Sequence, residues 1–183
     1  MRTADFRRQQ AEVVHPEMAE LGKRPVAPVV WAVTRITLGF VFLWAFFDKT
    51  FGLGYATPAE RAWIDGGSPT AGFLGGVEGP FQGFFTSMAG DAWADWLFML
   101  GLLGIGAALV LGIAMRIATA AGALLLVLMW MAVLPLENNP VVDDHIVYAL
   151  FLVGLATARA GETLGLGEVW KRLPLVQRFP ILR

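Results

Sequence analysis

Three consecutive residues, Asp143, Asp144 and His145, are the strongest candidates for chemistry in this sequence. Crowded carboxylates push their pKa values apart, and an imidazole exchanges protons near neutral pH. Such a group could serve proton-coupled redox chemistry on a quinone or an oxyanion substrate. A metal site that adds Glu137 is a weaker alternative, because Asp144 and His145 would point to different faces of a helix and no second histidine is nearby. We therefore predict a catalytic Asp143–His145 cluster without a metal ion.

Asp48 and Lys49 are the second candidates, because they are expected at the same membrane depth as the Asp143–His145 cluster. One interpretation is an ordinary charged stop at the membrane edge. In the other, both residues belong to the catalytic site, where Lys49 offsets a carboxylate-rich field that would repel an anionic substrate. We predict catalytic roles for both residues.

Four residues around the cluster could bind a substrate or a quinone head group. They are Trp130, Glu137, Asn139 and Tyr148. Asn139 and Pro140 form a plausible helix cap, which would place the cluster in the first turns of a helix. The helix dipole favours carboxylates there, and the hydroxyl of Tyr148, one turn further on, could reach the cluster.

Arg35 lies inside an apolar stretch, where a charged side chain is costly unless it snorkels or finds a partner. It could snorkel to the cytoplasmic surface. It could instead face the interior of a helix bundle and bind an anion or a polar head group, which is the role we predict. The same helical face would then carry Arg35, Gly39, Phe42, Phe46 and Lys49.

Four long apolar stretches must position these residues. They run roughly over 29–47, 96–114, 117–136 and 146–160. A helix needs about 20 residues to cross about 30 Å of hydrocarbon, and the fourth stretch reaches that length if its helix begins near Pro140. With 56% hydrophobic and 16% charged residues, the composition also departs from that of soluble domains. We predict an all-α integral membrane protein with a bundle of four transmembrane helices and lipid as its surroundings.

The charges predict that both termini are cytoplasmic. Basic residues precede the first stretch, sit in the turn before the third and follow the fourth, whereas carboxylates gather in the other loops. We therefore assign 1–27 to a cytoplasmic N-terminal segment, 28–160 to the membrane domain and 161–183 to an interfacial C-terminal segment. The latter is expected to be helical or irregular.

The loop at about 50–95 is expected to be a structured, aromatic-rich cap over the outer mouth of the bundle. Thr57 to Glu60 reads as a capping box with proline at the first helical position, and Ser68-Pro69 precedes a second short helix. Small residues at four-residue spacing predict close packing of the second and third spans. They are Gly104, Ala108 and Gly112, followed by Ala114, Ala118 and Gly122.

The residue inventory limits the cofactors. The chain has no cysteine, which removes Cys-ligated iron–sulfur clusters and thiol relays. Its two histidines, His15 and His145, would lie on opposite sides of the membrane, so they cannot pair on one haem. No nucleotide-binding glycine motif is present, and we predict neither a flavin site nor a nucleic-acid partner. Electrons would pass directly to a quinone or through a partner's cofactor.

Four segments resemble the DoxX family, and within it the DoxD-like branch. They are Arg35–Lys49, Ala62–Phe73, Asp95–Gly104 and Glu137–Leu150. The resemblance covers about residues 28–160 and implies a four-helix protein of a prokaryotic cytoplasmic membrane. It further implies a subunit like that of thiosulfate:quinone oxidoreductase, which oxidises thiosulfate to tetrathionate and reduces a membrane quinone. That enzyme works with a second, DoxA-like subunit, so a similar partner is expected.

A non-enzymatic alternative remains open. The chain could be an accessory subunit whose bundle docks against a larger respiratory complex. A transporter or channel is less favoured, because intramembrane charges are few and no inverted repeat or broken helix is visible.

Overall fold

The computed structural model describes residues 26–183, so the predicted N-terminal segment lies outside the described residues except at its last two positions. The described chain is helical and contains no strand. Its four long helices are α3 (Val26–Phe51), α6 (Ala92–Leu111), α7 (Met115–Ala132) and α8 (Asp144–Thr157). The short elements between α3 and α6 are η1 (Ala59–Arg61), η2 (Trp63–Asp65), α4 (Ala71–Gly75) and α5 (Gln82–Thr86). After α8 follow α9 (Gly167–Trp170), α10 (Pro174–Arg178) and η3 (Pro180–Leu182).

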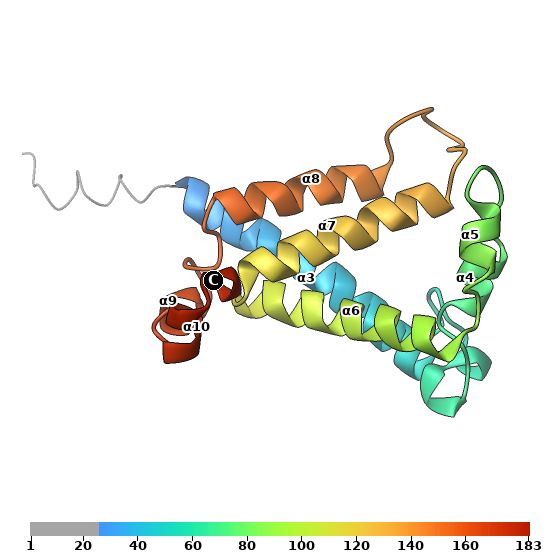
Figure 1. The fold of residues 1–183 in the computed structure, drawn as a ribbon, viewed down its shortest axis with the longest axis horizontal. Helices are drawn as coiled ribbons and strands as arrows, with labels where there is room; N and C mark the ends of the chain where they lie inside the picture. The colour runs from blue at the N-terminus through green and yellow to red at the C-terminus, as the bar shows by residue number, and fades with distance from the viewer. Residues whose placement is uncertain (1–25) are drawn as a thin grey trace, which may run out of the picture.

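The long helices form two pairs, α3 with α6 and α7 with α8, which share one apolar core. The pairs meet closely where α6 turns into α7, and they splay apart toward the opposite end (Figure 1). We call the first end, with the α6–α7 turn and the C-terminal segment, the turn end. The second, which carries residues 52–91 and 133–143, is the loop end.

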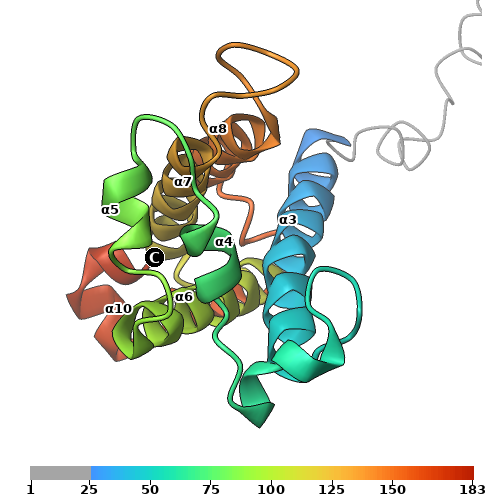
Figure 2. The same ribbon diagram turned by 90° about the vertical axis from the view of Figure 1, so that its right-hand side faces the viewer.

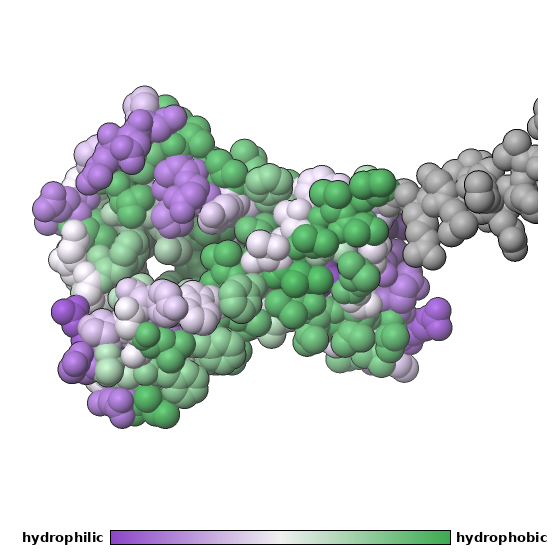
Figure 3. All heavy atoms as spheres, turned by 180° about the vertical axis from the view of Figure 1, so that it is seen from behind, coloured by the Kyte–Doolittle hydropathy of each residue, from purple (hydrophilic) through white to green (hydrophobic). Residues whose placement is uncertain are grey.

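Three helices, α3, α6 and α7, are long and apolar enough to cross a membrane, which is the pattern of a multi-pass membrane protein. Hydrophobic residues cover the middle of the face drawn in Figure 3, and hydrophilic residues gather at its two ends. α8 is apolar but has only 14 residues, or about 21 Å of helix. It begins at Asp144, four residues after Pro140, so the expected start of this helix is wrong.

Two glycines let the helices of the first pair approach closely. A Cβ on Gly39 would come within 2.8 Å of the Val110 side chain, and one on Gly106 within 2.8 Å of Leu43. Gly104, which we expected at a helix contact, has no atom within 4 Å of its Cβ position. Gly122 packs against Leu152 of α8 and, less closely, against α6. α6 and α7 are neighbours, as predicted, but Gly104 does not contribute to their contact, because periodicity shows which residues share a face but not which helix covers it.

Two buried carboxylates tie the segment between α3 and α6 to the helices on either side. Asp48 accepts hydrogen bonds from the backbone N–H groups of Tyr55 and Ala56, at 3.2 and 3.0 Å. Asp95 accepts from the hydroxyl and backbone N–H of Thr70, at 2.6 and 3.0 Å, and from the hydroxyl of Ser68. α4 and α5 then lie across the loop end in the end-on view of Figure 2. The expected short helices are present, but no side chain caps η1, so the capping box at 57–60 does not form.

Candidate functional site

A pocket of about 440 Å³ lies at the loop end, where the two helix pairs diverge. α6 and α7 form its walls, α4 and α5 cover it, and the last turn of α3 contributes Lys49. Several residues at its rim are exposed and apolar, among them Trp93, Leu97 and Leu124. In a membrane, such a pocket would open sideways, toward the lipid.

The pocket wall on α6 is a stripe of residues spaced by four. These residues are Trp93, Leu97, Gly101 and Ile105. Gly101 has no side chain, and a Cβ there would meet no atom within 4 Å, so this part of the wall is open. The sequence interpretation missed these residues. The sequence did contain a signal, because Gly101 lies at four-residue spacing from aromatic and aliphatic residues. The spacing of Gly104, Ala108 and Gly112 instead indicated a different face of the helix.

Lys49 is the one charged residue that lines this pocket within the described part of the chain. Its Nζ lies 6.0 Å from the ring centroid of Phe98, at the limit of a cation–π contact. It donates no side-chain hydrogen bond to the residues that the structure describes. The predicted site residue Lys49 thus faces an apolar cavity with its ammonium group available to a ligand.

Asp48 has a different place from the one predicted. Its side chain is 1% exposed, and its two oxygens hold the backbone at 55–56. It does not line the pocket. A carboxylate committed to two backbone N–H groups is positioned to fix the loop, so its geometry supports an anchoring role instead of a catalytic one.

The Asp143–His145 cluster is compact. His145 Nδ1 lies 2.6 Å from Asp143 Oδ2 and 3.6 Å from Asp144 Oδ1. The other oxygen of Asp143 accepts from the backbone N–H of Ile146 at 3.3 Å and caps α8. Burial alone would raise the pKa of Asp143, but the hydrogen bonds from His145 and Ile146, with the charge of His145, hold that pKa below its ordinary value.

The cluster also corrects two expectations. The potential metal-ligating atoms of Asp143, Asp144 and His145 lie within 4.8 Å of one another, so Asp144 and His145 do not point to different faces. Glu137 is exposed and does not belong to this group. The cap and the Asp143–His145 contact explain the proximity without an ion. Neither aspartate nor His145 lines the pocket, so the cluster and Lys49 are not in one site as predicted.

Two of the other predicted residues around the cluster, Trp130 and Asn139, hold the 133–143 loop in place. Trp130 Nε1 donates to the Val141 carbonyl at 3.1 Å. Asn139 accepts from the backbone N–H groups of Val141 and Val142, which closes a turn before the helix instead of capping it. Tyr148 is half-buried and packs against the core. Among the residues that the structure describes, none of these three contacts the pocket.

Arg35 is fully buried near the turn end, which excludes the snorkelling interpretation. Its five N–H groups meet five backbone carbonyls. Two belong to the last turn of α6, Leu109 and Val110, and three follow α8. These are Ala160 at 3.1 Å, Thr163 at 3.3 Å and Leu164 at 2.8 Å. No donor is left for a head group, so the predicted binding role of Arg35 does not fit. Arg35 instead satisfies carbonyls at the end of α6 and in the segment after α8.

Comparison with known proteins gives no match: no protein family, no curated protein and no solved structure is similar to this chain at a significant level. The candidate site therefore rests on its own geometry.

Proposed function

We propose that the chain is a DoxX-type membrane protein with four membrane helices, both termini in the cytoplasm and residence in a prokaryotic cytoplasmic membrane. The motifs at 35–49, 62–73, 95–104 and 137–150 support the family. The basic turn at Arg116 and the basic C-terminal segment support the orientation, which places the loop end outside. α8 would be the fourth span, because its exposed side chains, such as Leu150 and Val153, are apolar. Its deficit in length would be met by flanking residues and local thinning of the bilayer.

Within this protein, the pocket at the loop end is proposed to bind the ring of a membrane quinone. The single observation that carries this is a lipid-facing apolar pocket with one cation, Lys49, on its wall. Its volume of about 440 Å³ falls in the range of small-molecule sites. Phe73, Phe84 and Phe98 offer aromatic contacts to a ring, and Lys49 can donate a hydrogen bond to a quinone carbonyl oxygen.

The electron donor would be thiosulfate or a related small anion. Two thiosulfate ions joined through a new sulfur–sulfur bond give tetrathionate and release two electrons. The quinone takes these electrons with two protons and becomes the quinol, so the reaction balances. The Asp143–His145 cluster, with its imidazole in contact with a carboxylate, would exchange protons with water at the outer surface. Because the cluster does not line the pocket, it would act on the donor side or through bound water.

A second function, that of an accessory subunit, is favoured by a specific observation. The chain has no cysteine, so any thiol or iron–sulfur electron carrier would have to come from a partner such as a DoxA-like subunit or a respiratory complex. In that case the pocket would still hold a quinone, but the chain alone would show no turnover.

The test pairs two glycines of α6. Gly101 lines the pocket and Gly104 does not, yet a Cβ on either would meet no atom within 4 Å. Gly101→Phe should fill the pocket without disturbing the fold, and Gly104→Phe is the matched control. We expect quinone-analogue binding, followed by tryptophan fluorescence quenching, to fall at least tenfold in Gly101→Phe only. Equal binding by both variants would contradict the proposed site.

Thiosulfate-dependent reduction of the analogue then separates the two functions. Turnover by the purified chain, or by the chain with one small partner, supports the oxidoreductase. Binding without turnover, together with stoichiometric recovery in a large respiratory complex, supports the accessory subunit.

A further inference from the structure

A second cavity, of about 710 Å³, lies at the turn end between the start of α7, the end of α8 and the C-terminal segment. Five basic side chains and one acidic side chain line it. The basic ones are Arg116, Arg159, Lys171, Arg172 and Arg183, and the acidic one is Glu162. This cavity is therefore basic, whereas the pocket at the loop end is apolar. The basic cavity plays no part in the proposed redox function.

The C-terminal segment is held over this cavity by specific contacts. The backbone N–H of Arg116 donates to the Arg183 carbonyl at 3.0 Å, and Arg116 Nη1 donates to the Pro180 carbonyl at 3.1 Å. Trp170 Nε1 donates to the Leu182 carbonyl at 2.5 Å, and Val176 is buried. The cavity wall is thus a folded structure.

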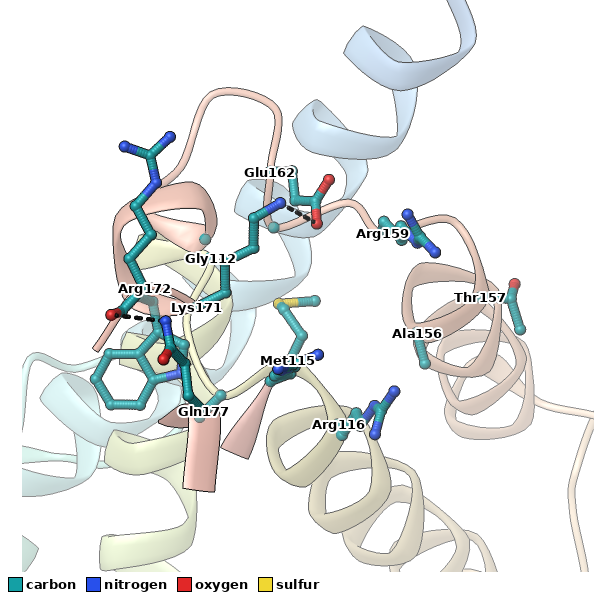
Figure 4. A pocket seen from close by; sticks show the side chains of 15 residues that line it. Gly112, Met115, Arg116, Ala156, Thr157, Arg159, Glu162, Lys171, Arg172 and Gln177 are labelled. Atoms are coloured by element: carbon teal, nitrogen blue, oxygen red, sulfur yellow. Dashed lines mark hydrogen bonds and ion pairs between the residues drawn. The ribbon is translucent and has the colours of Figure 1, made fainter. Parts of the chain in front are cut away.

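Only some of the basic side chains of the cavity are paired with acceptors among the described residues. Lys171 Nζ contacts Glu168 Oε1 at 2.6 Å and Glu162 Oε1 at 3.2 Å, so the acidic side chain of the wall is already neutralised. Arg159 donates no side-chain hydrogen bond within residues 26–183. Arg116 uses one of its donors. In Figure 4, Arg116 at the start of α7 and Arg159 after α8 lie on opposite sides of the same open space.

We propose that this cavity binds the phosphate-bearing head group of an anionic phospholipid. The planar fork of arginine matches phosphate oxygens in pairs, and basic pockets between membrane helices on the cytoplasmic side suit such head groups. The exposed face of α7 continues from Arg116 through Ala120 to Leu124, which is 61% exposed. On α8, Thr157 follows the exposed Val153 by one turn. Acyl chains can therefore lie along both helices while the phosphate contacts the two arginines.

The test uses the purified full chain in phosphatidylcholine with or without phosphatidylglycerol. Native mass spectrometry counts the retained lipid, and thermal unfolding reports the apparent affinity. The wild-type chain should retain one phosphatidylglycerol molecule and melt at a higher temperature with it. Arg159→Gln should weaken the apparent affinity about fivefold, and the variant that also carries Arg116→Gln about 25-fold, since each basic side chain contributes a factor of roughly five.

Arg178→Gln is the matched control, because Arg178 lies in α10 beside Phe179 and does not line the cavity. It should bind lipid like the wild-type chain. Arg159→Gln keeps the proposal testable if the double variant fails to fold, since Arg116 also holds the C-terminal segment. Stabilisation by inorganic phosphate without preference for phosphatidylglycerol would overturn a lipid ligand, and equal lipid binding by Arg159→Gln and Arg178→Gln would overturn the site.

Discussion

Arg35 and Lys49 are two basic residues of the same helix, and they have opposite surroundings. Arg35 lies where α6 ends, and two carbonyls of that helix end, with three from the segment after α8, accept its five N–H groups. Lys49 lies where α6 begins, and a helix start presents unpaired N–H groups instead. A cation there finds no carbonyl partners. The direction of the neighbouring helix thus makes one cation structural and leaves the other available to a ligand.

Replacement of Arg35 should have the largest effect. Arg35→Met would leave four carbonyls without a donor within residues 26–183, since only the Leu109 carbonyl also accepts from a backbone N–H, that of Gly112, and each unsatisfied buried group costs about 1–3 kcal/mol. We expect a loss of at least about 3 kcal/mol and little folded protein in size-exclusion profiles. Arg35→Lys keeps the charge but only three donors and should fall in between. If Arg35→Met melts within a few degrees of the wild-type chain, the structural role is wrong.

Replacement of Gly112, which lies beside Arg35, should have the next largest effect. Gly112 has a φ of +74°, and a Cβ there would lie 2.8 Å from the Gly161 carbonyl oxygen and 3.0 Å from Arg35 Nη1. Gly112→Ala should therefore cost about 1–3 kcal/mol through backbone strain and displacement of the guanidinium. Gly104→Ala, in open space within α6, should be neutral or slightly stabilising. Thermal unfolding of both variants measures the contrast, which would be lost if they melted together.

The Asp143 cap should make a smaller contribution. Asp143→Ala removes the side-chain cap of α8 and the contact with His145, for a loss of about 1 kcal/mol. Because folding lowers the pKa of Asp143, its stabilising effect is complete above the ordinary carboxyl pKa of about 3.9 and is lost as pH falls through the lower folded value. The difference in melting temperature between wild-type and Asp143→Asn proteins should therefore shrink in acid. A difference that grows in acid would contradict the sign.

Asp144 should contribute least to stability. Its side chain is 68% exposed and lies 3.6 Å from His145 Nδ1. Asp144→Asn should change the free energy of unfolding by less than about 0.5 kcal/mol.

The cluster's proposed proton exchange predicts in addition that His145→Ala abolishes turnover while folding is largely retained. Full turnover in both variants would reduce the cluster to a helix cap.

Apolar length and charge were enough to predict the all-helical class and the membrane-crossing pattern of α3, α6 and α7. The inward face of α3, from Arg35 through Gly39 to Phe42, also followed from helical spacing, and all three residues are buried. Partner choice did not follow. Whether Arg35 meets carbonyls or a ligand depends on which helix end lies opposite, and periodicity within one helix carries no such information. For the same reason Lys49 was grouped with Asp48 and the Asp143–His145 cluster, although only Lys49 reaches the pocket.

The most direct test of the distinction between a structural Arg35 and a ligand-binding Lys49 is the affinity of a quinone analogue for Lys49→Met. Lys49 donates no side-chain hydrogen bond within the described residues, so the variant should fold and melt like the wild-type chain. Loss of one hydrogen bond from a charged donor should weaken binding about tenfold or more. Unchanged affinity in the folded Lys49→Met variant would contradict the proposal that this cation serves the pocket.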